Sequence, residues 1–506
     1  MKKTLQIYYT SDVHGSFSPT DYATGAQTAP SLAACMAQFQ KDGNTLVIDG
    51  GDTLQGSPFT YWLYHQKQGG ACVPAQMLNL GGYDFITLGN HDFDYGRGEL
   101  ERFLSELDAQ CLCANIEGVR GVRKTAVVTL ENGLRVGLTG VTTAYVTNWE
   151  KPETMAGIRV TDAFGAAWSA LGELHRQRVD VTVCIYHGGF EIDPKTGGRL
   201  SQTDENQGWR MCQELGFDVL LTAHQHMAAE NLRISGTYAC QPPDKARAYA
   251  HLTVTCEGGH VQASSRLLPS GTEPLPAAIE LLAPHEDELA AWLDTPVGSL
   301  DVPITVDDPL AQARDGSLLS NFTNQVQLAF SGADISAAGL AGGGRGLPQA
   351  LTIRDIVSVY AFPNTLKTIR VRRAQLKAAL ERSMSYFSLA DDGTIVSNPD
   401  FHKPIVQHFN YDSIFGLDVD ADLRQPIGSR VTAIRYQGQE LDEKRELLLC
   451  LNSYRASGAG GYPAYAGCPL VSEVPVELSE LVMQYVQNNK SITVDQTRWL
   501  HILQNT

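Results

Sequence analysis

The sequence contains no apolar stretch near the ~20 residues that a membrane-spanning helix needs. Its first residues, MKKTLQIYYTSD, place two lysines before an apolar run of about five residues, whereas the apolar region of a signal peptide has ~7–15. That short run leads directly into Asp12, a candidate metal ligand. We therefore expect the segment to be a strand of the folded protein, and we predict a cytoplasmic protein with no membrane partner.

Positive charge is scarce, because 39 Lys and Arg residues face 56 Asp and Glu residues, for a formal net charge of −17. No dense run of basic residues occurs. A polyanion would be repelled, so we expect no nucleic-acid polymer as a partner. A small phosphorylated substrate is not excluded, because a bound metal ion can dominate the electric field inside a cleft.

Paired cysteine spacings are also lacking. The ten cysteines are spread through apparent core segments, such as Cys184 in an expected strand and Cys212 in an expected helix. Cys111 and Cys113 stand too close together for an ordinary zinc ribbon. We interpret the cysteines as reduced, buried thiols, which agrees with a cytoplasmic location.

Length and patterning predict an α/β chain with two domains. The chain has 506 residues, more than the ~250–300 at which single cores stop growing. From residue 4 to about 265, short apolar runs typical of strands buried on both faces alternate with helical patterns. New strand and helix patterns follow from about residue 332. We place the first domain at 1–305, a linker with a connecting helix near 316–330 at 306–331, and the second domain at 332–506.

Metal-capable side chains follow five of the expected strands. They are Asp12 and His14 in YYTSDVHG, Asp52 in LVIDGGD, Asn90 with His91 in FITLGNHD, His187 in VCIYHGG, and His224 with His226 in LLTAHQH. The carboxyl ends of parallel strands open on one side of a sheet, so ligands from remote parts of the chain can meet there. A single Asp-x-His or His-x-His is more often a polar loop, but five such segments predict a metal centre.

The ligand types point to a transition-metal pair. Residues two apart in an extended segment point the same way, so Asp12 with His14 can reach one ion, as can His224 with His226. Asp52 lies at the turn GGD, where one carboxylate could bridge two ions. Mixed histidine and carboxylate ligands suit transition metals better than Ca or Mg. Two ions about 3.5–4 Å apart would bind phosphoryl oxygens and activate an attacking water.

In this order, SDVHG, GGDTLQGSP, LGNHDFDYG, YHGG and AHQH resemble the motifs of the calcineurin-like metallophosphoesterases, and within them the 5′-nucleotidase / 2′,3′-cyclic-nucleotide phosphodiesterase family. The similarity spans nearly the whole chain. It implies a four-layer β-sandwich phosphoesterase domain with helices outside, linked by a helix to an α+β nucleotide-binding domain. It also implies two divalent metal ions (Mn, Zn, Co or Fe). Carried over to this sequence, one ion takes Asp12, His14, Asp52 and His226, and the other takes Asp52, Asn90, His187 and His224.

The resemblance leaves His91 without a metal ion. It implies that His91 points at the scissile phosphate and stabilises the transition state, paired with Asp94; Asp92 is the alternative partner. A carboxylate beside an imidazolium raises the histidine pKa and fixes its orientation. The alternative reading is that His91 is a spare polar group next to the ligands.

Three segments of the second half resemble the C-terminal signature segments of the same family: VYAFPNTL (359–366), HFNYDSIFGLD (408–418) and LNSYRASGAGGYP (451–463). In that family two aromatic rings sandwich the nucleotide base, and matching the segments gives Phe409 and Tyr454 as this clamp. By composition alone Phe409 would more often be a core residue. Stacking contributes ~1–3 kcal/mol per base and tolerates any base. Asn364 is expected to line or brace the same pocket, and Arg345 could meet a phosphate or be an ordinary loop arginine.

One loop position selects among substrates. Family members specialised for 5′-nucleotides often carry an aspartate near the end of the Gly-rich loop, where it accepts hydrogen bonds from both ribose hydroxyls. The loop here reads RASGAGGYP, with Gly460 at that position. We therefore predict hydrolysis of 2′,3′-cyclic nucleotides and 3′-nucleotides. The alternatives are a 5′-nucleotidase or UDP-sugar hydrolase, a non-catalytic nucleotide sensor, and a sulfur-compound hydrolase on the same scaffold.

Overall fold

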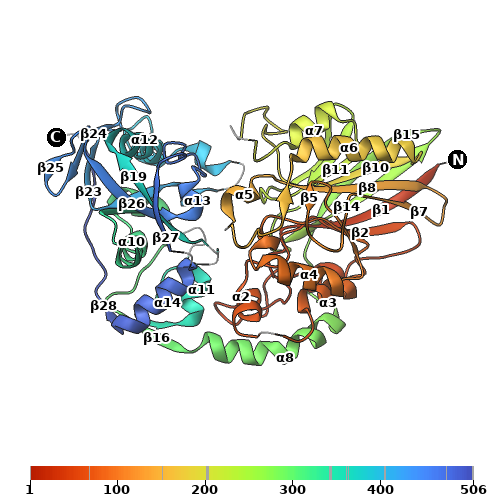
Figure 1. Cartoon of the computed structure of the whole chain (residues 1–506), viewed down its shortest axis with the longest axis horizontal. Helices are drawn as coiled ribbons and strands as arrows, with labels where there is room; N and C mark the ends of the chain where they lie inside the picture. The colour runs from red at the N-terminus through yellow and green to blue at the C-terminus, as the bar shows by residue number, and fades with distance from the viewer. Residues whose placement is uncertain are drawn as a thin grey trace. The chain divides into compact units, whose positions relative to one another are not determined.

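The computed structural model describes residues 2–67, 69–150, 152–200, 204–340, 345–360, 362, 364–403, 406–474 and 476–503. Figure 1 traces the chain, which divides into two compact units, Met1–Ala290 and Ala291–Thr506. No helix in the described parts of the chain is long and apolar enough to cross a membrane. All ten cysteines lie in described segments as free thiols, and every one except Cys468 is buried.

The first unit is built from strands and helices that alternate along the chain. Its strands are β1 (Lys3–Thr10), β2 (Thr45–Asp49), β3 (Phe85–Ile86), β4 (Gln110–Leu112), β5 (Ile116–Glu117), β6 (Val122–Arg123), β7 (Thr125–Thr129), β8 (Arg135–Thr142), β9 (Arg159–Val160), β10 (Val181–His187), β11 (Val219–Thr222), β12 (Ala229–Ile234), β13 (Thr237–Gln241), β14 (Ala248–Glu257) and β15 (His260–Pro269). Its helices are α1 (Leu32–Met36), α2 (Pro58–His65), α3 (Val73–Leu80), the 3₁₀ turn η1 (His91–Phe93), α4 (Gly96–Glu106), α5 (Val146–Trp149), α6 (Ala163–Arg176), α7 (Gly208–Glu214) and α8 (Pro276–Leu293), which runs on into the second unit.

Two sheets of the first unit pack face to face. One has the order β15-β14-β1-β2-β3-β4-β6 and the other β12-β13-β11-β10-β8-β7. Buried side chains such as Ile7 and Ile48 from the first sheet share a core with Leu138, Ile185 and Leu221 from the second. Helices α6 and α7 cover the outer face of the second sheet, and α3 and α4 lie on the opposite side of the unit (Figure 1). These four layers confirm the predicted α/β fold.

The parallel pairs decide where the loops emerge. Strand β1 runs parallel to β2, β2 to β3, and β10 to both β8 and β11. The predicted ligand segments follow β1, β2, β3 and β11, and β10 ends on His187 itself. Each ligand segment therefore leaves a buried strand at its carboxyl end, as the sequence pattern predicts.

The division between the units falls earlier than the predicted domain end at residue 305. The chain passes between the units inside α8, where Tyr22 donates to Glu286 (3.1 Å) in the first unit and Arg354 pairs with Asp294 (2.7 Å) in the second. The helix predicted as a connector exists as α10 (Leu318–Ser331), begun by its N-cap Ser317 and ended by Gly332 with φ +65°. Eight of its residues are buried, and the helix packs against β17 (Ile335–Gly339) and α14 (Leu478–Asn489) of the second unit.

The second unit contains two larger sheets, and each combines parallel with antiparallel strand pairs. Its elements are β16 (Pro296–Leu300), α9 (Pro309–Asp315), α10, β17 (Ile335–Gly339), β18 (Ala350–Thr352), α11 (Ile353–Val359), β19 (Leu366–Arg372), α12 (Arg373–Met384), β20 (Phe387–Leu389), β21 (Ile395–Ser397), η2 (Pro399–His402), η3 (His408–Asn410), β22 (Asp412–Phe415), β23 (Leu417–Ala421), β24 (Val431–Tyr436), β25 (Gln439–Glu440), β26 (Glu446–Asn452), α13 (Ser453–Ala456), β27 (Leu470–Val474), α14 (Leu478–Asn489), β28 (Ser491–Ile492) and β29 (Leu500–Ile502). The two larger sheets have the orders β22-β17-β26-β19-β27 and β25-β24-β23-β29.

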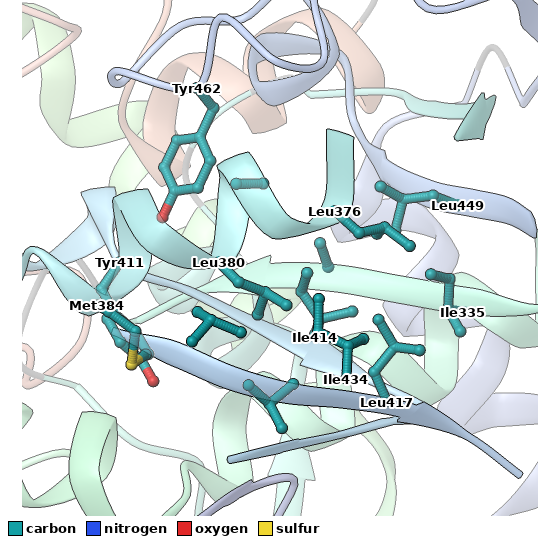
Figure 2. Close-up of a cluster of buried hydrophobic side chains, with 14 of the residues drawn as sticks. Ile335, Leu376, Leu380, Met384, Tyr411, Ile414, Leu417, Ile434, Leu449 and Tyr462 are labelled. Carbon is teal, nitrogen blue, oxygen red and sulfur yellow. The ribbon is translucent and has the colours of Figure 1, made fainter. Parts of the chain in front are cut away.

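Helix α12 joins these two sheets through a shared core. Figure 2 shows Leu376 and Leu380 of α12 pointing toward Ile414, Ile434 and Leu449, which come from strands of both sheets. Two of the predicted substrate residues lie next to strands of this core. Phe409 is in η3, shortly before β22, and Tyr454 is in α13, directly after β26. The core therefore fixes the backbones from which the predicted clamp residues project.

Candidate metal centre and substrate-binding residues

Backbone hydrogen bonds tie the loop after β1 to the loop after β2. The Asp12 N–H donates to the Gly51 carbonyl (2.9 Å), and the His14 N–H donates to the Asp52 carbonyl (2.9 Å). Gly51 has φ +90°, and a Cβ there would overlap the backbone of Gly89 in the loop after β3. Glycine at position 51 thus lets three loops meet closely.

Two buried carboxylates are held by backbone N–H groups of neighbouring loops. The Asp12 carboxylate accepts the His224 N–H at 2.9 and 3.1 Å, which links the loop after β1 to the loop after β11. Asp52 Oδ1 accepts the His91 N–H at 2.7 Å. These charge-assisted bonds fix both carboxylates before any ligand binds.

Two histidines are oriented from the outside by backbone carbonyls. His14 Nδ1 lies 2.8 Å from the Gln55 carbonyl oxygen, and His187 Nδ1 lies 2.7 Å from the Gly50 carbonyl oxygen. A carbonyl only accepts, so Nδ1 carries the proton in the neutral form and Nε2 presents its lone pair to the site. This arrangement is typical of metal-binding histidines.

The predicted ligands gather into two adjacent groups. The candidate ligand atoms of Asp12, His14 and His226 lie within 4.8 Å of one another, and so do those of Asp52, His187 and His224. Asn90 belongs to the second group, because its Oδ1 lies 3.2 Å from His187 Nε2. All seven residues that the sequence proposes as ligands are thus brought together, and their imidazole and carboxylate donors fit two transition-metal ions.

The backbone is strained at most of these positions. Five of the seven residues have positive φ, between +50° and +71°: Asp12, His14, Asp52, His224 and His226. Residues other than glycine rarely adopt this conformation, and each such residue costs about 1–3 kcal/mol. Strain of this kind collects at functional sites, where surrounding structure imposes it. Here the positive-φ conformations accompany the convergence of the side chains into one cluster.

Burial and neighbouring charges shift the pKa values of three groups in the cluster. Burial lowers the pKa of His14 to about 3, so this imidazole is neutral at neutral pH. Burial opposes the charge of Asp52, but the neighbouring His187 and His91 hold the pKa of its carboxyl well below the usual range. Burial also opposes a charge on His187, yet the Asp52 carboxylate raises its pKa to about 10. Asp52 is therefore ionised, as a carboxylate shared by two cations would have to be.

His91 belongs to neither donor group. Its Nδ1 lies 2.9 Å from Asp94 Oδ2; the His91 side chain is 23% exposed and that of Asp94 is 2% exposed. Asp92, the alternative partner, instead uses its carboxylate to accept backbone N–H groups at 2.8–3.1 Å from Asp52, Thr53, Leu54 and Gly89. Asp92 holds the loops together, and Asp94 orients the histidine.

The structure adds three residues around the histidines that no motif predicted. Glu205 Oε1 lies 3.0 Å from His224 Nε2, Asp244 Oδ2 lies 3.5 Å from His226 Nδ1, and the Trp149 ring stacks on that of His224 at 5.4 Å. A carboxylate accepts the Nε2–H of His224, which leaves Nδ1 as its free donor atom. These residues lie in segments without a recognisable pattern, so only the folded structure reveals them.

Glu205→Ala is expected to weaken Mn²⁺ binding about 10-fold, because partners that orient metal-binding histidines typically contribute 10–100-fold in affinity. Calorimetric titration of the metal-free protein measures the effect. Glu214→Ala removes an exposed glutamate that pairs with Arg210 and is the matched control. Equal affinities for the two variants would contradict this role for Glu205.

Of the four predicted substrate residues, Asn364 and Tyr454 lie near each other in the second unit. Asn364 Oδ1 accepts from Ser453 Oγ (3.4 Å), beside Tyr454 in α13. Phe409, in η3, and Tyr454 are both half-buried, so Phe409 is not a fully enclosed core residue. Arg345 is half-buried directly after residues 341–344, which lie outside the described chain.

Comparison with known proteins agrees with this arrangement. Residues 5–228 match the family model of the calcineurin-like phosphoesterases, and residues 296–467 match the model of the 5′-nucleotidase C-terminal domain. The chain is a calcineurin-like metallophosphoesterase with a 5′-nucleotidase C-terminal domain. Members of this family are phosphoesterase and nucleotidase hydrolases that use a dimetal centre, and the two donor groups are the candidate sites for it.

Several known proteins resemble this metallophosphoesterase along most of its length. A Staphylococcus aureus protein assigned provisionally as a 5′-nucleotidase, solved with α-ketoglutarate, is 30% identical with a TM-score of 0.88, over 99% of this chain and 100% of that one. The 2′,3′-cyclic-nucleotide 2′-phosphodiesterase/3′-nucleotidase of Haemophilus influenzae is 23% identical over 96% of this chain and 84% of its own. The trifunctional nucleotide phosphoesterase YfkN of Bacillus subtilis is 23% identical over 96% of this chain, which spans only 38% of that longer protein.

Proposed function

We propose that this metallophosphoesterase hydrolyses small nucleotides, with 2′,3′-cyclic nucleotides and 3′-nucleotides as its substrates. One metal ion would be held by Asp12, His14, Asp52 and His226, and the other by Asp52, Asn90, His187 and His224. Bound metal ions supply Lewis-acid stabilisation of the phosphoryl oxygens and lower the pKa of a bound water. The protein would hold the seven ligand side chains on loops that backbone hydrogen bonds join to one another, with five of the seven residues in a positive-φ conformation.

In this proposal His91 is the catalytic residue that contacts the scissile phosphate. Asp94 accepts the Nδ1–H, so the Nε2–H of the charged imidazole would be the donor to the phosphate. The side chain is 23% exposed, so a bound phosphate can reach it. A positioned cation of this kind stabilises negative charge as it grows in the transition state.

The backbone at Gly460 supports the choice of ester. Gly460 has φ +71°, and a Cβ there would overlap Arg455 Nη1 and Asn410 Oδ1. An aspartate at this position therefore does not fit the present loop, and Gly460 offers no side-chain acceptor to a free ribose diol. A nucleotide whose ribose oxygens are already esterified loses nothing by this, whereas a 5′-nucleotide loses two hydrogen bonds.

A substrate panel tests the choice. Protein reconstituted with Mn²⁺ is assayed with 2′,3′-cAMP, 3′-AMP and 5′-AMP, and kcat/KM is compared. We expect the first two to exceed 5′-AMP by about 10-fold or more, the value of one or two lost hydrogen bonds. A preference for 5′-AMP would instead support a 5′-nucleotidase, the description given to the Staphylococcus aureus relative.

If the protein hydrolysed no nucleotide at all, the alternative of a non-catalytic nucleotide sensor would be favoured. Retention of both donor groups speaks against that reading, because a protein that only binds nucleotides has no need of seven converging ligands. A sulfur-compound hydrolase would have no use for the half-buried rings Phe409 and Tyr454.

A further inference from the structure

Arg455 is the most enclosed cation of the substrate-binding region, with a side chain 6% exposed. Its Nε lies 2.8 Å from Asp412 Oδ2, and the Asp412 side chain is 2% exposed. The guanidinium also lies over the Tyr462 ring, 4.3 Å from its centroid. Burial alone would lower the pKa of Arg455, but Asp412 raises it, so the guanidinium is charged; burial raises the pKa of the Asp412 carboxyl, and the charge of Arg455 opposes that rise.

The Arg455 guanidinium also donates hydrogen bonds to two of the predicted substrate-binding segments. Nη2 donates to the carbonyl of Phe409 (3.0 Å), and Nη1 donates to the carbonyl of Ala459 (2.6 Å), next to Gly460. Arg455 itself follows Tyr454 in α13. One side chain thus connects the backbones that carry both predicted clamp rings and the glycine loop.

Tyr462 supports the Arg455–Asp412 pair through a set of buried hydrogen bonds. The Tyr462 hydroxyl accepts the Asp412 N–H (2.9 Å), donates to the Asn410 carbonyl (3.2 Å) and lies 2.9 Å from Ser383 Oγ in α12. Figure 2 places Tyr462 at the edge of the apolar core that α12 forms with the sheets. A displacement of Arg455 would therefore shift η3 and α13 relative to each other, while the core would remain in place.

We propose that Arg455, held by Asp412, is a positioning residue that sets the separation of the Phe409 and Tyr454 rings and thereby the affinity for a nucleotide base. Arg455 touches no base itself. It acts through the Phe409 carbonyl and through Tyr454, whose ring centroid lies 5.7 Å from the guanidinium carbon. This inference rests on the proposed nucleotide hydrolysis and adds a specificity element to it.

Arg455→Lys keeps the charge beside Asp412 but loses the planar fork that reaches two carbonyls at once. The test compares 3′-AMP with glycerol 2-phosphate, which has no base, by phosphate release. We expect the ratio of kcat/KM for 3′-AMP to that for glycerol 2-phosphate to fall about 10-fold, through KM for the nucleotide, because misplaced rings lose part of the stacking contribution.

Arg430→Lys is the matched control. Arg430 is also buried and donates Nη1 to the carbonyls of Met384 (2.8 Å) and Phe387 (2.7 Å), but it contacts neither clamp segment. We expect this variant to keep the wild-type ratio. A ratio that falls equally in both variants would mean general loosening of the unit and would overturn the inference.

Asp412→Asn covers the case in which Arg455→Lys does not fold. It removes the charge that holds Arg455 and preserves the side-chain volume, so the same fall in the ratio is expected. An unchanged ratio in either folded variant overturns the role of Arg455. If wild-type protein hydrolyses glycerol 2-phosphate but no nucleotide, the proposed function fails, and that outcome is distinct from a failure of the positioning role.

Discussion

Asp52→Asn is expected to lower kcat/KM for nucleotide hydrolysis by well over about 100-fold. Removal of an outer partner of a metal ligand already costs about 10–100-fold, and Asp52 is proposed as the inner ligand shared by both ions. It is fully buried, ionised and adjacent to His187, with 3.1 Å between Oδ2 and Nε2. An amide has the same shape but no negative charge, so two nearby cations would repel each other without compensation.

Elemental analysis together with kcat/KM measures this effect. Metal content is expected to fall below the two ions per chain that the proposal requires in the wild-type protein. Asp42→Asn is the control, because Asp42 is an exposed aspartate that accepts from the N–H of Asn44 in the turn before β2. An Asp52→Asn protein that keeps both ions and most of its activity would refute the shared-ligand assignment.

His91→Ala is expected to lower kcat by about 10²–10³-fold, the usual cost of removing one group that stabilises transition-state charge. Metal content should not change, because His91 lies outside both donor groups. Its backbone N–H, which Asp52 Oδ1 accepts at 2.7 Å, survives the substitution. The effect therefore separates a catalytic group from a ligand.

Asp94→Asn provides the companion measurement. It should lower kcat less than His91→Ala, since the imidazole remains but loses the carboxylate that orients it (2.9 Å). Adding Asp94→Asn to His91→Ala should cost little more, because residues that act as one unit are not additive. Loss of metal from His91→Ala would instead show that His91 is a ligand, and full additivity would separate Asp94 from His91.

Local pattern made the ligand set predictable. Each ligand follows an apolar strand, and parallel strands bring their carboxyl ends to one edge, so position along the chain implied position in space. This reasoning reached even Asn90, whose neutral oxygen has no charge to mark it. The resemblance favoured Asp94 over Asp92 as the partner of His91. Both lie on η1 or just after it, and in the structure they have different partners.

Domain limits were harder to predict from sequence. The proline-punctuated stretch before α10 looks like a linker, and α10 like a connector, because amphipathic pattern tells which residues are apolar but not which core they enter. In the structure α10 packs against β17 and α14 within the second unit, and α8 carries the chain between the units.

The sequence by itself determined the α/β fold class, the family, the seven candidate ligands and His91, because these depend on strand-end motifs that are contiguous in the chain. Only the tertiary structure revealed which residues Glu205, Asp244 and Arg455 contact. These side chains act on residues remote in sequence, and nothing local encodes such pairs: their contacts exist only after burial has brought the segments together.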